Sequence, residues 1–184
     1  MKRDIKKQES KQKIIEAALY LFSTKSFTNI SIRDIAKQAN VSPALIYKYF
    51  KDQQQLYIET MKLEGIKLIS RLKAFSRLEE LTLNYVNYMF KENVLYQMMA
   101  YFMLEANRPH TSIPIFAEIS ELIGIFEQSL KPIFQEEAKS EAQLLFSTLN
   151  GLLITYKNYP GFTSEQALEH ITFLVKRYIG HLPS

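Results

Sequence analysis

The fold is decided by one stretch, Ser31–Phe50, which reads SIRDIAKQANVSPALIYKYF. It holds two short helical patterns separated by a few residues. Apolar residues recur at intervals of three and four in the first pattern, which predicts one buried helix face: Ile32, Ile35, Ala36 and Ala39. Ser31 precedes this pattern as an expected N-cap, because its hydroxyl can accept from the amide of Asp34. The Asp34 carboxylate then lies near the positive end of the helix dipole.

The residues between the two patterns predict a sharp turn. Asn40 stands where the chain must reverse, and asparagine tolerates the left-handed backbone conformation well. Val41 is expected to fill the core. Ser42 is the expected N-cap of the next helix, with Pro43 at its first position, where the missing amide hydrogen costs nothing.

The second pattern is short and carries aromatic and basic side chains. Ile46 and Phe50 are four residues apart and are expected to face inward. The other faces carry Pro43, Ala44, Leu45, Tyr47, Lys48 and Tyr49. Tyr47 and Tyr49 could be core aromatics, but Ile46 and Phe50 already define the inward stripe. We therefore predict a helix-turn-helix whose second helix lies in the major groove of DNA.

Each side-chain type suits a different part of the duplex. Tyrosine hydroxyls and lysine ammonium groups fit phosphate oxygens, which set register and orientation. Ala44 and Leu45 are small or apolar, so they let the backbone approach and can touch thymine methyl groups.

Charge is distributed unevenly along the 184 residues, whose net charge is +4. Residues 1–51 hold 11 Lys and Arg against 4 Asp and Glu, whereas residues 52–184 hold 12 against 15. Such a surplus raises affinity for polyanions, either nucleic acid or an anionic membrane surface. For the four basic residues at the start, a solvated tail and a DNA-binding arm remain equal alternatives: Lys2, Arg3, Lys6 and Lys7.

Composition excludes several classes of site. The chain has no cysteine and only three scattered histidines, so no metal site, cofactor or catalytic residue is expected. Neither a secretory signal nor an apolar run of about 18 residues occurs. We therefore expect a cytoplasmic protein that is not an enzyme.

The rest of the chain repeats apolar residues at helical spacing, which predicts an all-α protein. The expected helices cover 11–24, 52–75, 78–91, 93–107, 114–131, 138–157 and 164–180. We place the domain boundary between 51 and 62. This gives an N-terminal DNA-binding domain over residues 1–57, with its motif at 31–51, and a helical effector-binding and dimerisation domain over 58–184.

The stretch KQKIIEAALYLFSTKSFTNISIRDIAKQANVSPALIYKYFKDQQQLY, residues 11–57, resembles the DNA-binding domain of TetR (tetracycline-repressor-like) transcriptional regulators. The resemblance implies DNA contacts from Ser31, Arg33, Ser42, Pro43, Ala44, Leu45, Tyr47, Lys48, Tyr49 and Lys51. The chain departs from the family pattern at Asn40 and Ser26, where glycine is usual. It also has Leu45 in place of a small polar residue.

The resemblance also implies a homodimer. The segment EAQLLFSTLNGLLITYKNY, residues 141–159, is apolar nearly all round, which suits burial against its own domain and a partner. Burial wholly within one domain is the alternative. A module that reads a palindrome favours the dimer, because two half-sites require two modules. The expected interface residues are Leu145, Leu149, Leu152, Ile171, Leu174, Val175 and Tyr178.

A small-molecule pocket is implied for the C-terminal helices. Adaptable and aromatic residues are concentrated in VLYQMMAYFMLEANRPH, residues 94–110, and could line an apolar cavity. The expected lining is Tyr85, Tyr88, Met89, Met99, Phe102, Met103, Arg108 and Asn150. Ordinary core packing is the alternative for most of them, and Asn150 is either a satisfied core amide or a ligand contact.

These patterns lead to one principal hypothesis. The chain is expected to be a bacterial repressor that binds a palindromic double-stranded operator as a homodimer and is released by a largely apolar effector. An activator of the same family and a helical protein of lipid or membrane surfaces are the alternatives. An enzyme is disfavoured because no nucleophile elbow, phosphate-binding loop or dinucleotide fingerprint occurs.

Overall fold

The computed structural model describes residues 2–25, 29–105 and 116–183, without the side chains of residues 2–6, 98, 101–105 and 116. All regular structure within these ranges is helical, as predicted. None of the described helices is long and apolar enough to cross a membrane.

The chain folds into two compact units. Unit 1 comprises residues 1–64 and 93–115, and unit 2 comprises residues 65–92 and 116–184. This division differs from the expected boundary at residue 57, because the helix that begins at Asn93 packs on the first helix of the chain. The Asn93 side chain donates from Nδ2 to the Ser23 carbonyl oxygen at 2.8 Å, which anchors that packing.

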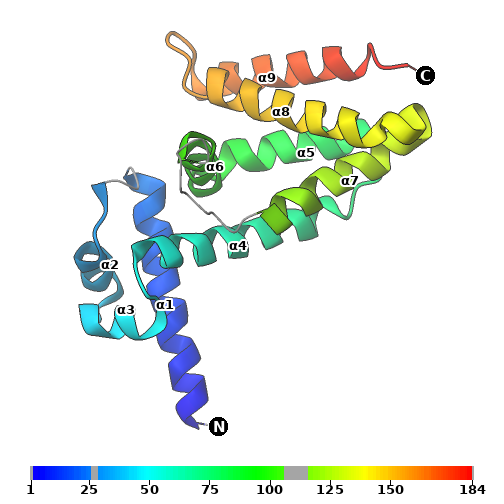
Figure 1. Ribbon diagram of the computed structural model, residues 1–184. Coiled ribbons are helices and arrows are strands. Elements are labelled where there is room, and N and C mark those ends of the chain that lie inside the picture. Colours follow the sequence, from blue (N-terminus) through cyan, green and yellow to red (C-terminus); the bar gives the residue numbers. More distant parts are fainter. Residues whose placement is uncertain (1, 26–28, 106–115, 184) are drawn as a thin grey trace. The chain divides into compact units, whose positions relative to one another are not determined.

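Unit 1 is built around the first helix (Figure 1). Its elements are α1 (Lys2–Thr24), α2 (Ile32–Ala39), α3 (Pro43–Tyr49), the first part of α4 (Gln53–Leu72) and α6 (Asn93–Glu105). The predicted inward stripe of α1 is buried, as are the apolar residues of α2 and α3 that meet it: Ile14, Ile15, Ala18, Leu21, Phe22, Ile32, Ile35, Ala36 and Ile46. The Phe22 and Tyr57 rings meet edge to face at 5.4 Å and join α1 to α4.

Helix α1 begins at Lys2, nine residues before the expected start. The added segment is rich in lysine, glutamine and glutamate, which have high helix propensity. It extends a helix that the buried stripe already nucleates, so each further residue adds a hydrogen bond without a new nucleation cost.

The turn between α2 and α3 has the predicted geometry. Asn40 lies in the left-handed region, with φ 53° and ψ 50°. Its amide donates to the Lys37 carbonyl at 3.2 Å, and the Val41 amide donates to the Ala36 carbonyl at 2.9 Å. This pair of bonds satisfies the last carbonyls of α2 and sets the direction in which α3 leaves. Val41 itself is only half-buried, so its contribution to the core is smaller than expected.

Substitutions at Asn40 should show how strongly this backbone conformation is constrained. Glycine adopts positive φ without a steric cost, so Asn40→Gly is expected to preserve or slightly raise stability. Alanine pays the left-handed penalty, and Asn40→Ala is expected to lower the free energy of unfolding by about 1 kcal/mol. Urea denaturation of both variants measures the difference. Equal stability of the two would contradict the role of the backbone angle.

Unit 2 contains the remaining helices (Figure 1). They are the last part of α4, α5 (Leu78–Lys91), α7 (Phe116–Phe134), the short 3₁₀ helix η2 (Gln135–Glu137), α8 (Ala138–Tyr156) and α9 (Ser164–Ile179). α7 and α8 are joined by η2 and pack directly against each other, while α9 packs on α5 and α8. Thr163 and Gln166 form a capping box that starts α9.

Candidate nucleic-acid interface

The start of α2 is fixed by a reciprocal capping box between Ser31 and Asp34. The Asp34 amide donates to Ser31 Oγ at 3.2 Å, and the Ser31 amide donates to Asp34 Oδ2 at 2.8 Å. Ser31 Oγ also donates to the same carboxylate oxygen at 2.5 Å. The side-chain and then the backbone hydrogen bonds from Ser31 hold the pKa of Asp34 below its ordinary value. The box fixes the helix that precedes the turn.

The depressed pKa of Asp34 predicts a pH dependence of stability. The ionised carboxylate is favoured in the folded state, so its stabilising contribution is present above the unfolded pKa, near 3.8. It is lost as the pH falls through the folded pKa. Asp34→Asn should therefore flatten the acid limb of stability against pH, measured by urea denaturation between about pH 3 and 7. Glu169→Gln, which removes an exposed carboxylate from α9, is the control. An identical acid limb in Asp34→Asn would contradict the linkage.

Helix α3 is capped and oriented by its own first residues. The Leu45 amide donates to Ser42 Oγ at 3.3 Å and to the Ser42 carbonyl at 3.0 Å. Pro43 occupies the first turn, as predicted. Ile46 is fully buried and Phe50 is 1% exposed, which confirms the inward stripe. The short helix is therefore held along one face while its other faces are turned outward.

Most of the predicted DNA-contacting side chains lie at the surface of unit 1. The exposed ones are Ser31, Arg33, Ser42, Pro43, Ala44, Tyr47, Lys48 and Lys51. Tyr47 is 57% exposed, which is unusual for so large a ring and fits the predicted outward face. Arg33 on α2 and Lys48 on α3 add exposed positive charge. The structure thus brings an aromatic hydroxyl and basic groups onto the free faces of α2 and α3.

Leu45 and Tyr49 are half-buried rather than exposed. The Tyr49 ring lies 6.5 Å from the Phe50 ring at an interplanar angle of 56°. Part of Tyr49 therefore packs on the core, and only the rest of the side chain remains available to a ligand.

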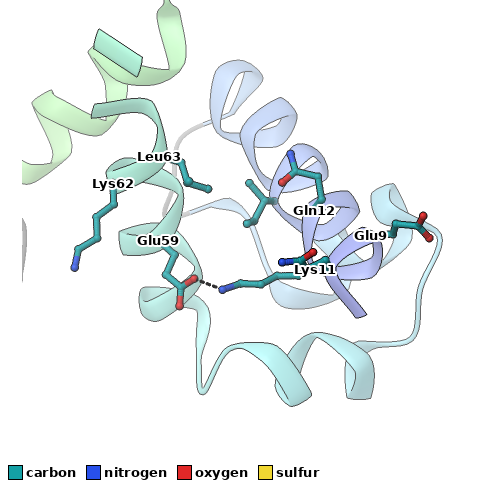
Figure 2. A pocket seen from close by; sticks show the side chains of 8 residues that line it. Glu9, Lys11, Gln12, Glu59, Lys62 and Leu63 are labelled. Atoms are coloured by element: carbon teal, nitrogen blue, oxygen red, sulfur yellow. Dashed lines mark hydrogen bonds and ion pairs between the residues drawn. The ribbon is translucent and has the colours of Figure 1, made fainter. Parts of the chain in front are cut away.

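Lys11 joins three parts of unit 1 (Figure 2). Its Nζ lies 2.6 Å from Glu59 Oε2 on α4 and 5.4 Å from the centre of the Phe50 ring. Phe50 ends α3, so one ammonium group ties α1 and α4 to the end of the outward-facing helix. The lysine and glutamate side chains are 40% and 31% exposed, so solvent weakens the attraction between their charges.

An open pocket of about 750 Å³ lies beside this ion pair, between α1 and α4. Figure 2 shows its side chains, which include Gln12, Lys62 and Leu63. Two lysines and two glutamates line it together with amide and apolar groups: Gln8, Glu9, Lys11, Gln12, Ile15, Glu59, Lys62 and Leu63. The charges balance, so the lining favours neither anions nor cations.

The sequence reasoning missed the role of Lys11. The available signal was its position four residues before Ile15, in line with the apolar stripe of α1. A lysine at the edge of this buried stripe is expected to extend its ammonium group toward a polar or acidic side chain. Glu59 is 48 residues away, so its identity could not be read from local spacing.

The residues predicted to line an effector pocket are divided between the two units. Tyr85 and Met89 are buried and Tyr88 is half-buried on α5 of unit 2, with Asn150 buried on α8. Met99 is half-buried on α6 of unit 1. The guanidinium of Arg71 lies 5.7 Å from the centre of the Tyr88 ring. The side chains of Phe102 and Met103, and the whole of Arg108, lie outside the described residues.

The structure corrects the expected surface of α8 and α9. Four of the residues assigned to a dimer interface are at most 1% exposed within unit 2 of a single chain: Leu145, Leu149, Ile171 and Val175. Leu152, Leu174 and Tyr178 are half-buried. The large apolar side chains that these helices do expose are Leu144, Ile154 and Phe173, at 54%, 43% and 57%. Because α8 is apolar nearly all round, its sequence alone did not distinguish the inward face from the outward one.

The comparisons with known proteins agree with this geometry. Residues 14–60 match the family model of bacterial regulatory proteins, tetR family. The HTH-type transcriptional regulator AcrR of Shigella flexneri is 41% identical over 56 residues, which is 30% of this chain and 26% of that protein. The curated relatives are matched over only 22% to 33% of their own length.

Two solved structures extend the similarity to most of the chain. A transcriptional regulator of the TerR/AcrR family from Aquifex aeolicus VF5 has a TM-score of 0.72 at 22% identity, covering 92% of this chain and 99% of that one. The transcriptional regulator FadR from Bacillus subtilis, in complex with stearoyl-CoA, has a TM-score of 0.67 at 19% identity, covering 89% and 96%. At these identities the likeness concerns the fold.

These features define a helix-turn-helix protein: two capped helices, α2 and α3, a tight turn between them, and an outward face on α3. Over residues 14–60 this N-terminal module is similar to that of the TetR family of bacterial regulatory proteins.

Proposed function

We propose that the chain is a cytoplasmic, ligand-responsive regulator of transcription that binds a palindromic operator as a homodimer. A small molecule bound in unit 2 releases the DNA, so the regulator acts as a repressor. The observation that carries this proposal is α3. Its inner face is fixed by Ile46 and Phe50, while Tyr47 and Lys48 stand outside the core. A rigid, capped helix with free aromatic and basic groups suits the major groove and its flanking phosphates.

Selection of duplex DNA from a random pool tests this proposal. The purified protein should enrich a palindromic motif, and affinity for that motif should fall steeply between about 50 and 200 mM salt. A reporter gene placed behind the selected motif then separates repression from activation. Enrichment of no motif, or of one without two-fold symmetry, would contradict the proposed mode of binding.

The exposed apolar residues of α8 and α9 support a homodimer. Leu144 and Ile154 share an outward face of α8 with Ser147 and Gly151, where small residues allow close approach. A Cβ added at Gly151 would meet nothing within 4 Å in the single chain. Phe173 supplies an exposed ring on α9. A second copy of the chain covers these side chains in the proposed assembly, which also supplies the second DNA-binding module.

Phe173→Glu is expected to weaken the dimer. A charged side chain at a buried aromatic position should raise the dimer dissociation constant about tenfold or more. Light scattering after size exclusion should show twice the chain mass of 21.5 kDa for the parent and a shift toward a single chain for the variant. Tyr20→Glu is the matched control, because Tyr20 is 56% exposed on α1 in unit 1. A parent protein of single-chain mass would refute the assembly.

The effector proposal rests on unit 2. FadR from Bacillus subtilis, which shares the fold, was solved with stearoyl-CoA, so the fold can accommodate a small molecule with a long apolar part. We extend this to a largely apolar effector of the present chain. Release requires that the effector prefer a dimer geometry whose recognition helices no longer match two half-sites of B-DNA. A differential affinity of about 5 kcal/mol between the two geometries suffices to switch occupancy.

A further inference from the structure

We infer that Asn150 is the hydrogen-bond donor for a neutral, carbonyl-bearing effector held beside Tyr85 in unit 2. This inference rests on the proposed function, since it names the chemistry of the proposed effector. Asn150 is fully buried, and its Nδ2 group makes no hydrogen bond to any described residue. A buried amide that offers two hydrogens and uses neither is costly, because both have lost their hydrogen bonds to water. A bound acceptor removes that cost.

The orientation of the amide follows from Tyr85. The Tyr85 hydroxyl lies 2.6 Å from Asn150 Oδ1, 65 residues along the chain, and donates its hydrogen to that oxygen. The opposite orientation would leave both the amide oxygen and the hydroxyl hydrogen without a partner. The observed orientation satisfies these two groups and leaves the amide hydrogens available. The site therefore presents a donor, so its ligand must present an acceptor.

The surroundings of this donor favour a neutral ligand. Among the described residues of unit 2, the polar side chains of fully buried residues are Thr82, Tyr85 and Asn150, none of which is charged. The half-buried Glu118 adds a buried carboxylate oxygen without a hydrogen-bond partner in the described part of the chain, which disfavours an anion further. Thr82 Oγ1 donates to two carbonyl oxygens of its own helix, that of Leu78 at 2.8 Å and that of Glu79 at 3.0 Å. Burial raises the pKa of Tyr85 well above its ordinary value, so that hydroxyl stays neutral. A carboxylate brought here would lose its hydration without gaining a cation.

Aromatic rings border Tyr85, the partner of the donor, and define the apolar part of the site. The Phe126 ring of α7 meets Tyr85 edge to face at 5.6 Å, and the Phe146 ring of α8 lies 6.0 Å from it. Helices α5, α7 and α8 thus converge on Tyr85. A ketone, ester or amide with an apolar body matches both parts, because its oxygen meets Nδ2 while its hydrocarbon lies against the rings.

Matched probes can isolate the contribution of the carbonyl oxygen. Acetophenone is paired with α-methylstyrene, and 2-decanone with 2-methyl-1-decene, because each alkene replaces the oxygen by a methylene group of similar shape. Decanoate serves as the charged probe. The readouts are the dissociation constant and the ¹H–¹⁵N signals of the Asn150 side-chain amide, assigned by their loss in Asn150→Leu.

We expect at least one ketone to move an Asn150 amide proton downfield and to bind about fivefold or more tightly than its alkene. Decanoate should bind more weakly than 2-decanone. Asn150→Leu should abolish the preference for the ketone while retaining binding of the alkene. Equal binding within both pairs, unmoved amide signals, or a water molecule that contacts Nδ2 and is not displaced by ketones would each overturn the inference. Because the dissociation constants of ketones and alkenes are measured in the parent protein, that comparison stands even if the variant fails to fold.

Failure of this inference can be distinguished from failure of the proposed function. Operator binding by the ligand-free protein tests the latter independently. Ketone binding through Asn150 without any effect on operator affinity would support the site and refute its regulatory role. Release of the operator by compounds whose binding is indifferent to Asn150→Leu would support regulation and refute the site.

Discussion

Replacement of Phe50 by alanine is expected to lower the free energy of unfolding by about 3 to 5 kcal/mol, because it empties a fully packed position at the end of α3. The Phe50 side chain is 1% exposed and lies beneath the ammonium group of Lys11. The variant therefore loses both the packing of the ring and the link between α1 and the end of α3. Urea denaturation followed by circular dichroism measures the loss.

Tyr47→Ala is the matched control for this prediction. It removes an aromatic ring from the same short helix, but at a position 57% exposed. Its expected effect on stability is within about 0.5 kcal/mol. Similar losses for the two variants would mean that α3 has no distinct inner and outer face. Among the molecules that fold, Tyr47→Ala should weaken DNA binding more than Phe50→Ala does, since Tyr47 lies on the proposed DNA-contacting surface.

Lys48→Ala is expected to weaken operator binding about 100-fold or more while leaving stability unchanged. A hydrogen bond to a charged phosphate contributes about 1.5 to 3 kcal/mol, and the proposed dimer contains two copies of the residue. If Lys48 contacts phosphate, the loss should be similar for all sequences, and the slope of affinity against salt should fall by about one for each copy. Titration of the selected operator at several salt concentrations measures both quantities.

Lys139→Ala controls for the loss of one positive charge. Lys139 is exposed on α8, outside unit 1, so the substitution changes net charge equally without touching the proposed DNA surface. Unchanged affinity for Lys48→Ala, or equal losses for the two variants, would remove Lys48 from the interface. A variant of Arg33 tests the contribution of α2 in the same assay.

Local features of unit 1 could be predicted well from the sequence. Four of them depend only on residues within a few positions, and the structure confirms each: the Ser31 cap, the left-handed Asn40, the Ser42 cap and Pro43 in the first turn of α3. Hydrogen-bonding side chains and permitted backbone angles determine such features before any tertiary contact forms.

Features that depend on distant partners could not be predicted. Lys11 meets Glu59 across 48 residues, and Tyr85 meets Asn150 across 65. Many pairs of charged or polar residues are compatible with the same helical pattern, and only packing selects one. The same reason applies to α8, where Leu144 and Leu145 are adjacent in sequence but only Leu145 is buried. Hydrophobic periodicity carries little information where both faces are apolar.

The composition of unit 1 limits how the protein can be cut and recombined. Its residues come from two stretches of the chain, 1–64 and 93–115, and α6 packs on α1 through the Asn93–Ser23 hydrogen bond. A fragment ending at residue 57 would lose this helix and expose the side of α1 that it covers. A chimera that exchanges the helix-turn-helix with that of another protein therefore needs to transplant α6 as well, or redesign the surface of α1 beneath it.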